Sequence, residues 1–439
     1  MSTWIKTIPS PIFQKLLPYL VCFSASLFFA YELVQFHMMN AISPYLMKDL
    51  QIGGACFGKL CASYLLADVI FLLPAGIILD RFSTRKIILS ALLICIVGTF
   101  GFSMATTFKE AAICHFLSGI GNAFCFLSCM MLIARWFSKE KQALIIGLVI
   151  TIGMAGAVFA QYPVSLIAEL FSWRSALACD AGIGMVIFAL IYLFVHDGPK
   201  PATQSSSFTF WTGLKKSVLN SQNILCGLFT CFMNMPLMVL SAVWGSLFLT
   251  QVHGIPLTKA SFIVGMVSMG TIIGSPLTGY LSNKLGRKKP LMLWGSLLSI
   301  ILMTLIMILP HPSEVMLTSL FLLLGLSTSS QVLGYPLITE NSPKELTGTS
   351  MGIAAVIIMG LPMIMQPLSG ALLDWNWKGT MFNGAPYYSH ANYIIAFLLF
   401  PIGFFLSFLA TYFIREKFGL EDNIEGDVRT SHNVVTQLS

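Results

Sequence analysis

Residues Gly76–Lys86 read GIILDRFSTRK, and this stretch decides the fold of the chain. An apolar run of at least twenty residues leads into it, and another apolar run follows it. A hydrocarbon core about 30 Å thick is crossed by about 20 apolar residues of helix. The stretch therefore predicts a short basic turn between two membrane-spanning helices.

A second basic turn, GYLSNKLGRKK at Gly279–Lys289, begins 203 positions after the first (279 − 76) and also lies between two apolar runs. A further match has a similar offset. Lys139 precedes Gly147 by eight residues, as Lys344 precedes Gly352, and the two pairs are 205 positions apart (344 − 139). Two matches at nearly the same offset predict a duplicated unit, which is a common plan of membrane transporters.

The composition excludes a soluble protein. The 439 residues are 56% hydrophobic and 10% charged, whereas soluble domains carry about 25% charged residues. We predict an all-α polytopic membrane protein with twelve transmembrane helices in two pseudo-symmetric six-helix bundles. The predicted spans are 16–42, 56–79, 86–107, 110–135, 143–167, 174–196, 223–250, 257–282, 289–310, 314–338, 349–373 and 391–414. Because little chain is left over, we expect neither an enzyme nor a nucleic-acid-binding protein.

Lysine and arginine residues are distributed unevenly between the two sides of the predicted bundle. With the N-terminus placed inside, 19 of the 25 fall on that side. The other side receives Lys48, Lys59, Lys109, Arg174, Lys259 and Lys378. This is the positive-inside bias, so we expect both termini in the cytoplasm and the chain in a cell membrane, the inner membrane of a bacterium.

A polar segment separates six predicted helices from six. It contains Pro199, Pro201 and a run of serines at 205–207, and its end has the pattern of an interfacial amphipathic piece. The predicted divisions are an N-terminal bundle at 1–197, a cytoplasmic linker at 198–222, a C-terminal bundle at 223–415 and a cytoplasmic tail at 416–439.

We select three ionisable residues inside predicted spans of the first half as candidates for proton coupling. Glu32 is near the middle of the first span, where an ionisable group costs roughly 2.5–3.5 kcal/mol and normally faces a bundle interior or a wet cavity. It is either a hydrogen-bonded structural group or a carboxylate that exchanges protons or contacts substrate. Asp68 either pairs with a neighbouring helix or lines the same cavity. His115 is either a packing residue or part of a polar stripe with Ser118 and Asn122.

Other polar side chains interrupt the apolar spans, and we expect them to contact a small solute. They are Gln35, Asn122, Gln161, Asn234, Trp244, Gln331, Tyr335 and Gln366. Asp180 lies towards the outer end of the sixth span, and we expect it to be interfacial. The second half carries prolines that predict bent or broken helices: Pro236, Pro276, Pro336, Pro362 and Pro367. The ten cysteines form no Cys-x-x-Cys pair and no metal-ligand spacing is present, so we expect neither a metal nor a cofactor.

The paired basic turns resemble those of the major facilitator superfamily, and the resemblance covers essentially the whole chain. Members carry Gly-x-x-x-Asp-Arg/Lys-x-Gly-Arg-Arg/Lys between helices 2 and 3, with an echo between helices 8 and 9. The first copy here has Ser83 at the second glycine and its basic pair one place late, and the second copy has Asn283 at the acid position. The resemblance implies a gate on the cytoplasmic side with Asp80 as the stronger latch. The gate residues that it implies are Gly76, Asp80, Arg81, Arg85, Gly279, Lys284, Gly286 and Arg287.

The family also carries Arg-x-x-x-Gly-x-Gly in helix 4, where the arginine is often tied to proton coupling. Here Gly119 and Gly121 fit, and His115 replaces the arginine. The resemblance therefore implies a role for His115 in proton coupling, beside Glu32 and Asp68.

Short stretches are similar to a branch of bacterial importers of amino acids and nucleosides, to which lysosomal dipeptide transporters are distantly related. They are Tyr31-Glu32, the residues 154–157, Trp244-Gly245, and Gln366-Pro367 followed by Asp374. This resemblance implies a small nutrient as the solute.

Together these features predict a secondary active transporter that takes up a small zwitterionic or neutral organic solute with protons by alternating access. The solute classes considered are an amino acid, a short peptide or a nucleoside. Because no lysine or arginine lies deep within a span, an organic anion is disfavoured. Proton-driven efflux of drugs or metabolites, and a transporter-like receptor without transport, stay as alternatives. The expected partners are the solute, protons and the lipid bilayer, and we expect a monomer because two halves can build the pathway alone.

Overall fold

The computed structural model describes residues 11–198, 215–343, 346–375, 377–382 and 384–416. Within these residues, twelve helical segments are long and apolar enough to cross a membrane. The predicted all-α fold with twelve spans is thereby confirmed. Most of the predicted linker and the tail after Glu416 lie outside the described residues.

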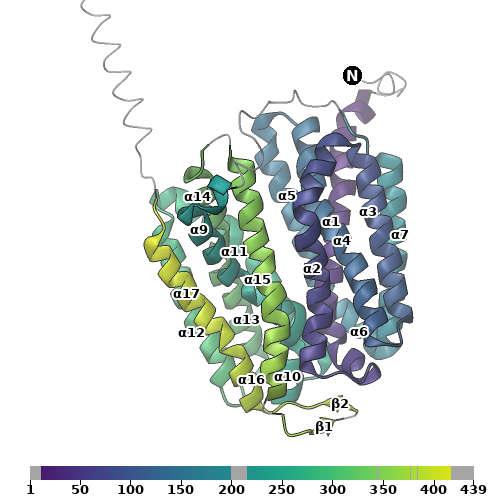
Figure 1. The fold of residues 1–439 in the computed structure, drawn as a ribbon, viewed down its shortest axis with the longest axis vertical. Helices are drawn as coiled ribbons and strands as arrows, with labels where there is room; N and C mark the ends of the chain where they lie inside the picture. The colour runs from purple at the N-terminus through teal and green to yellow at the C-terminus, as the bar shows by residue number, and fades with distance from the viewer. Residues whose placement is uncertain (1–10, 199–214, 344–345, 376, 383, 417–439) are drawn as a thin grey trace, which may run out of the picture.

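The first half contributes six spans, and the fifth span is interrupted. Ala160 and Gln161 separate α5 from α6, and the φ and ψ angles of Gln161, −84° and −84°, are not helical. The other five spans are single helices (Figure 1). The elements are α1 (Pro11–Asp49), α2 (Gly54–Arg81), α3 (Thr84–Met104), α4 (Phe108–Trp136), α5 (Lys139–Phe159), α6 (Tyr162–Leu170) and α7 (Trp173–Phe194).

The second half contributes the other six spans, and two of them change helix type. The π-helix η2 begins at Pro236, and the 3-10 helix η3 ends three residues before Pro336, whereas α11 and α15 continue through their prolines. The elements are α9 (Ser221–Met235), η2 (Pro236–Trp244), α10 (Gly245–His253), α11 (Leu257–Leu285), α12 (Lys289–Ile308), α13 (Glu314–Thr328), η3 (Ser329–Leu333), α14 (Gly334–Glu340), α15 (Thr347–Trp375), β1 (Met381–Phe382), β2 (Ala385–Pro386), α16 (His390–Phe397) and α17 (Leu399–Phe413).

Local sequence signals set the ends of several helices. The Ser83 side chain caps α3 by accepting the N–H of Lys86 at 3.3 Å. Thr107 and Glu110 form a capping box at the start of α4. Gly286 ends α11 with φ +63°, a left-handed conformation that glycine adopts without steric cost. The turns between helices are therefore encoded locally, as in soluble proteins.

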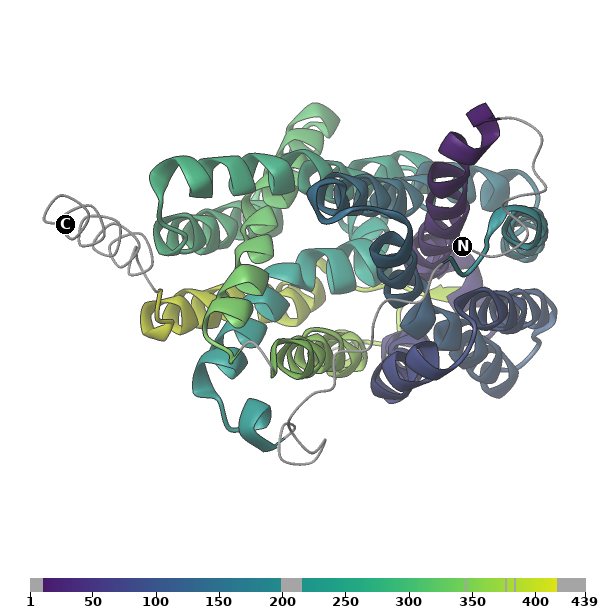
Figure 2. The same cartoon turned by 90° about the horizontal axis from the view of Figure 1, so that it is seen from above.

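The two faces of the molecule are distinguished by what lies on them. The β1–β2 hairpin lies at one end of the helices, which we call the hairpin face, and the described chain ends lie at the other, which we call the terminal face (Figure 1). Viewed from the terminal face, the two halves form two bundles side by side (Figure 2).

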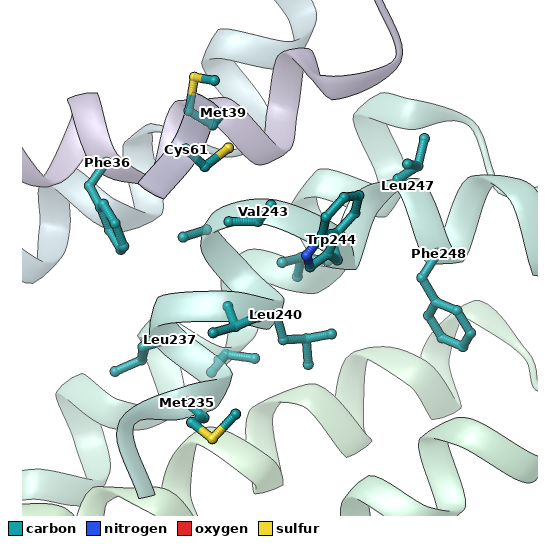
Figure 3. Packing of buried hydrophobic residues seen from close by; sticks show 14 of the residues in the cluster. Phe36, Met39, Cys61, Met235, Leu237, Leu240, Val243, Trp244, Leu247 and Phe248 are labelled. Carbon is teal, nitrogen blue, oxygen red and sulfur yellow. The ribbon is translucent and has the colours of Figure 1, made fainter. Parts of the chain in front are cut away.

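A shared apolar core joins the two halves on the hairpin side. It contains Phe36 and Met39 of α1 and Cys61 of α2, which lie opposite η2 and α10 (Figure 3). η2 supplies Trp244, which is fully buried. A second apolar cluster lies entirely within the first half. The halves are therefore packed as one body at this level of the membrane.

α2 and α15 pack closely near the hairpin face and separate towards the terminal face (Figure 1). Near the hairpin face, a Cβ on Gly370 would overlap the backbone of Gly54, and one on Gly58 would overlap that of Gln366. Towards the terminal face, a Cβ on Gly360 would meet no atom within 4 Å. The structure is thus closed between these two helices at the hairpin face.

Candidate functional site

Glu32 is fully buried inside the first half. Its Oε2 atom accepts a hydrogen bond from the Tyr64 hydroxyl at 2.7 Å, whereas Oε1 has no hydrogen-bond partner among the described residues. Oε1 is directed at Gly121 of α4, where a Cβ atom would overlap it. Gly121 therefore makes room for the carboxyl group. A buried carboxyl oxygen without a donor is a site that a proton can occupy.

Tyr64 of α2 brings the three predicted proton-coupling residues to one place. Its hydroxyl bonds Glu32, and its ring packs on His115 with 5.1 Å between centroids. Asp68 is buried one turn further along α2, with its carboxyl group facing the side-chain amide of Asn122. Tyr64 was not among the residues selected from the sequence, although its four-residue spacing from Asp68 indicates a shared helix face.

His115 lies between two aromatic rings. Its centroid is 5.1 Å from that of Tyr64 and 5.3 Å from that of Phe102, and the side chain is 1% exposed. Its Nδ1 atom has no hydrogen-bond partner within the described part of the chain. These are the surroundings of a packing residue, but the unpaired nitrogen leaves one position where a proton or a water molecule can bind.

Gln35 belongs to a polar network inside the first half. Its amide nitrogen donates to the carboxylate of Asp180 on α7, and its oxygen accepts a bond from the Thr99 hydroxyl at 2.9 Å. The Thr99 and Ser118 hydroxyl oxygens are 3.3 Å apart. Asp180 is 4% exposed, so the expectation of an interfacial position was wrong. No pattern in the sequence indicated the partner of Asp180, because Gln35 lies 145 positions away in the chain.

Gln161 and Asn40 connect the halves on the hairpin side. Gln161 accepts a hydrogen bond from the Asn40 amide at 2.7 Å and donates to the backbone oxygen of Ser241 in η2 at 2.9 Å. Asn40 donates to the hydroxyl of Ser246 at 2.6 Å and accepts from its N–H at 2.8 Å. Because Gln161 lies in the gap between α5 and α6, its side chain can reach the other half.

Asp374, at the end of α15, forms a second connection between the halves. Its carboxylate accepts the backbone N–H groups of Gly54 at 3.0 Å and Ala55 at 2.7 Å, the first residues of α2. The Tyr388 hydroxyl donates to the same carboxylate at 2.6 Å and accepts from the N–H of Gly54 at 2.7 Å. A carboxylate at a helix N-terminus satisfies unpaired donors and the helix dipole together. Asp374 had no role predicted from the sequence, because a contact between one helix end and a residue of the other half leaves no local pattern.

Trp244 and Gln366 form hydrogen bonds within the second half. The Trp244 indole N–H donates to the Ser369 hydroxyl at 2.7 Å, and its ring packs against Phe57 of α2 with 5.4 Å between centroids. The Gln366 amide donates to the backbone oxygen of Met238 at 2.8 Å. In this conformation both side chains tie η2 to α15.

Asn234, Gln331 and Tyr335 lie where helices of the second half are irregular. Asn234 is two residues before η2, Gln331 is in η3, and Tyr335 is in α14. Their exposed fractions are 6%, 7% and 37%. α9 packs against both η3 and α14, so the three residues share one region. Irregular helix turns of this kind are frequent at functional sites.

The basic turn of the first half is held by an acid that the sequence analysis did not select. Asp197, after α7, accepts the Ser83 hydroxyl at 2.5 Å and the backbone N–H of Arg85 at 2.8 Å. Arg135, at the end of α4, lies 4.0 Å from the same carboxylate. Arg85 also donates to the backbone oxygen of Tyr192 at 2.5 Å. Within the described residues, Asp197 is thus the acid at the start of α3.

The second half repeats this arrangement with different residues. Glu416, after α17, accepts the backbone N–H of Lys288, as Asp197 does that of Arg85, 203 positions earlier (288 − 85). Glu340, at the end of α14, binds the Lys288 ammonium at 2.7 Å and lies 205 positions after Arg135 (340 − 135). The two offsets equal those found in the sequence.

The other predicted gate residues line the terminal face. A Cβ on Gly76 or Gly279 would meet no atom within 4 Å. Arg81, Lys284 and Arg287 are exposed, and Gly286 makes the left-handed turn after α11. The side chain of Asp80 lies outside the described part of the structure. No group of three or more histidine, cysteine, aspartate or glutamate side chains among the described residues is placed to hold a metal ion.

The sequence profile of the Major Facilitator Superfamily matches residues 23–367 and 228–427 of this chain. The chain therefore belongs to this superfamily of membrane transporters.

Curated relatives are distant but span most of the chain. Membrane sensor protein UhpC of Salmonella typhimurium is 22% identical over 77% of this chain and 82% of its own length. The probable galactarate/D-glucarate transporter GarP of Escherichia coli is 22% identical over 70% and 77%. The gallate transporter of Pseudomonas putida is 22% identical over 65% and 69%.

Solved structures share the fold at low identity. A bacterial homologue of the human lysosomal transporter Spinster, in an inward-facing and unoccupied conformation, gives a TM-score of 0.74 at 15% identity over 91% of this chain and 98% of its own. A variant of the nucleoside transporter NupG gives 0.74 at 16% identity over 90% and 100%.

Proposed function

We propose that the protein is a secondary active transporter that takes up a small zwitterionic or neutral organic solute together with protons. Glu32 is the principal proton acceptor, with Asp68 and His115 around it. The supporting observation is the fully buried Glu32 carboxyl group, whose Oε1 atom lacks a donor among the described residues. An ionisable group within a membrane span is retained where it has a function or a dedicated partner.

The orientation follows from charge. Most lysine and arginine residues lie on the terminal face, as in the basic turns, so we place that face in the cytoplasm of a bacterial cell. The hairpin face then lies outside. With the hairpin face closed by Asp374 and Gln161, the structure corresponds to a state that exchanges solute with the cytoplasm.

The proposed solute class rests on where lysine and arginine residues lie along the membrane-spanning helices. In the described spans, lysine and arginine occur only within the first or last two turns of their helices. A buried anion is ordinarily held by a guanidinium or ammonium group. Asn234, Gln331 and Tyr335 instead offer neutral hydrogen-bonding groups.

The test is uptake by the full-length protein in liposomes with an imposed pH gradient, acidic outside. Pools of labelled amino acids, short peptides and nucleosides are presented to the unaltered protein and, in parallel, to the Glu32→Gln variant. We expect gradient-driven uptake that Glu32→Gln abolishes, while exchange of labelled for unlabelled solute persists. Equal gradient-driven uptake by both proteins would leave Glu32 a structural residue.

The relatives favour a second candidate solute and a second candidate role. Two of them are named for carboxylates, galactarate/glucarate and gallate, and one is named a sensor. Galactarate, glucarate and gallate therefore belong in the competition assay, and an anion as sole effective competitor overturns the neutral or zwitterionic class. A chain that binds a solute in the same assay but transports none fits the sensor role.

A further inference from the structure

Asp180 is a buried acid that the proposed function does not use. It lies on α7, against which α1, α3 and α6 pack, and it is 4% exposed. Among the described residues, Gln35 is the one side chain that donates a hydrogen bond to its carboxyl group, and no lysine, arginine or histidine forms an ion pair with it. A buried carboxylate without a cationic partner is costly, so binding of a proton stabilises this group.

Tyr31 places a free hydroxyl group beside Asp180. Tyr31 and Gln35 are one turn apart on α1, so both face α7. A Cβ atom on Gly184, one turn beyond Asp180, would lie 2.6 Å from the Tyr31 hydroxyl oxygen. This hydroxyl is buried and has no hydrogen-bond partner among the described residues. A hydroxyl donates to a carboxylate and accepts from a carboxylic acid, so Tyr31 can serve Asp180 in both protonation states.

The titratable groups that face Asp180 are neutral or acidic. Tyr31 and Glu32 of α1 and Cys95 of α3 lie close enough to interact with it electrostatically. On α6, the acid Glu169 is exposed. None of these groups supplies a positive charge that would keep Asp180 ionised.

Hydrogen bonds connect the surroundings of Asp180 with those of Glu32. Gln35 lies one turn beyond Glu32, and its amide oxygen accepts from the Thr99 hydroxyl at 2.9 Å. The Thr99 and Ser118 hydroxyl oxygens are 3.3 Å apart, and Ser118 belongs to α4, the helix at which Glu32 Oε1 is directed. Two carboxyl groups in one apolar bundle repel each other when both are charged.

We propose that Asp180 is a second proton-binding carboxyl group, and that Asp180 and Glu32 carry at most one negative charge between them at neutral pH. Each proton binds to a carboxyl oxygen and is exchanged with water, and no other bond changes. The consequence for transport rests on the proposed function: the pair releases its protons one at a time, so Glu32 releases its proton only while Asp180 holds one.

Infrared spectroscopy of the full-length protein in lipid bilayers tests the proposal, because a carboxylic acid and a carboxylate have separate stretching bands. Aspartate labelled with ¹³C in its carboxyl group shifts the aspartic acid bands away from those of glutamic acid. Spectra are recorded over a pH series. We expect a labelled acid band that disappears towards alkaline pH and that is missing from Asp180→Asn. Asparagine keeps an oxygen that accepts from Gln35, so this variant should fold.

Glu32→Gln tests whether the two groups share a charge. Without the negative charge of Glu32, Asp180 should lose its proton at lower pH, where the proton concentration is roughly tenfold higher. The matched control is Glu169→Gln, which removes an exposed acid from α6 and should leave the Asp180 band at its original pH.

A pH series without an Asp180 acid band, or a band that disappears at the same pH in Glu32→Gln, overturns the proposal. If Asp180→Asn does not fold, Gln35→Met identifies the band instead, because it removes the hydrogen bond to Asp180 and shifts the frequency. The spectra require no solute. A failure of this proposal is therefore distinguishable from a failure of proton-coupled uptake, which the liposome assay measures.

Discussion

Asp374 caps the first turn of α2 from the opposite half of the protein, accepting the N–H of Gly54 at 3.0 Å. Burial raises the pKa of the neighbouring Tyr388 above its ordinary value, and so does its hydrogen bond to Asp374, so its hydroxyl stays a donor. The Asp374 carboxylate therefore holds the hairpin face closed with charge-assisted hydrogen bonds, which contribute about 1.5–3 kcal/mol each.

Asp374→Asn is expected to open the hairpin face. Loss of the charge removes roughly 1.5–3 kcal/mol from the closed state, a shift of about tenfold or more in the equilibrium. Opening can be measured in a variant that retains Cys61 as its sole cysteine, because Cys61 is buried where the halves pack (Figure 3). An impermeant thiol reagent added at the hairpin face should label Cys61 faster when Asp374→Asn is also present. Glu110→Gln is the control, since Glu110 caps its own helix. An unchanged labelling rate in Asp374→Asn would show that Asp374 does not hold the hairpin face closed.

Gly370→Ala is expected to destabilise the protein, and Gly360→Ala on the same helix is its control. A Cβ on Gly370 would overlap the backbone of Gly54, and overpacking of this kind costs about 1–3 kcal/mol. A Cβ on Gly360 would meet nothing within 4 Å, so alanine there should be neutral or stabilising by up to about 1 kcal/mol. Thermal unfolding of the purified variants measures both. Equal melting temperatures would contradict close packing of α2 on α15.

Tyr64→Phe removes the hydroxyl that bonds Glu32 and leaves the ring on which His115 packs. We expect a cost of about 1–2 kcal/mol in stability. Gradient-driven uptake should fall more than solute exchange, because the change acts on the proposed proton acceptor. Tyr162→Phe is the control, as Tyr162 is 44% exposed on α6. If Tyr64→Phe lowers uptake and exchange by the same factor, Tyr64 serves the fold and not the coupling.

Asp197→Asn is expected to cost about 1–3 kcal/mol. It removes the carboxylate that caps α3 and faces Arg135, whose side chain is 4% exposed. Glu169→Gln, an exposed acid on α6, should change stability little. The melting temperatures of the two variants give the comparison. A neutral Asp197→Asn would show that Ser83 alone suffices to begin α3.

The number of helices and their duplication were predictable because both can be read directly from the sequence. The helices correspond to apolar runs, and the duplication to short motifs that recur at a fixed offset. Apolar runs of about twenty residues follow from the thickness of the bilayer. The repeat offsets of 203 and 205 recur in the structure between Arg85 and Lys288 and between Arg135 and Glu340. Residues at equivalent positions in the two halves are thus separated by the same offsets as the two basic turns.

The partners of the buried polar residues were not predictable. Glu32 and Gln35 were selected because they are polar residues in an apolar run, but that pattern does not indicate which neighbouring helix each side chain contacts. Glu32 accepts a hydrogen bond from Tyr64, and Gln35 donates one to Asp180. Asp374, Asp197 and Glu416 were missed because each binds backbone N–H groups of a distant helix start. Backbone donors are present at every position, so a sequence cannot mark which of them will be used.

The π-helix η2 gives the contact between the halves a discrete register. The N–H of Gly245 bonds the oxygen of Leu240, five residues back. Rewinding η2 into an α-helix would move every such partner by one residue and rotate Ser246 relative to Asn40. Intermediate pairings break hydrogen bonds in a setting without water, so they are unstable. We therefore expect the step out of this conformation to behave as a switch with a barrier, and its rate to be set by backbone re-pairing at nine residues.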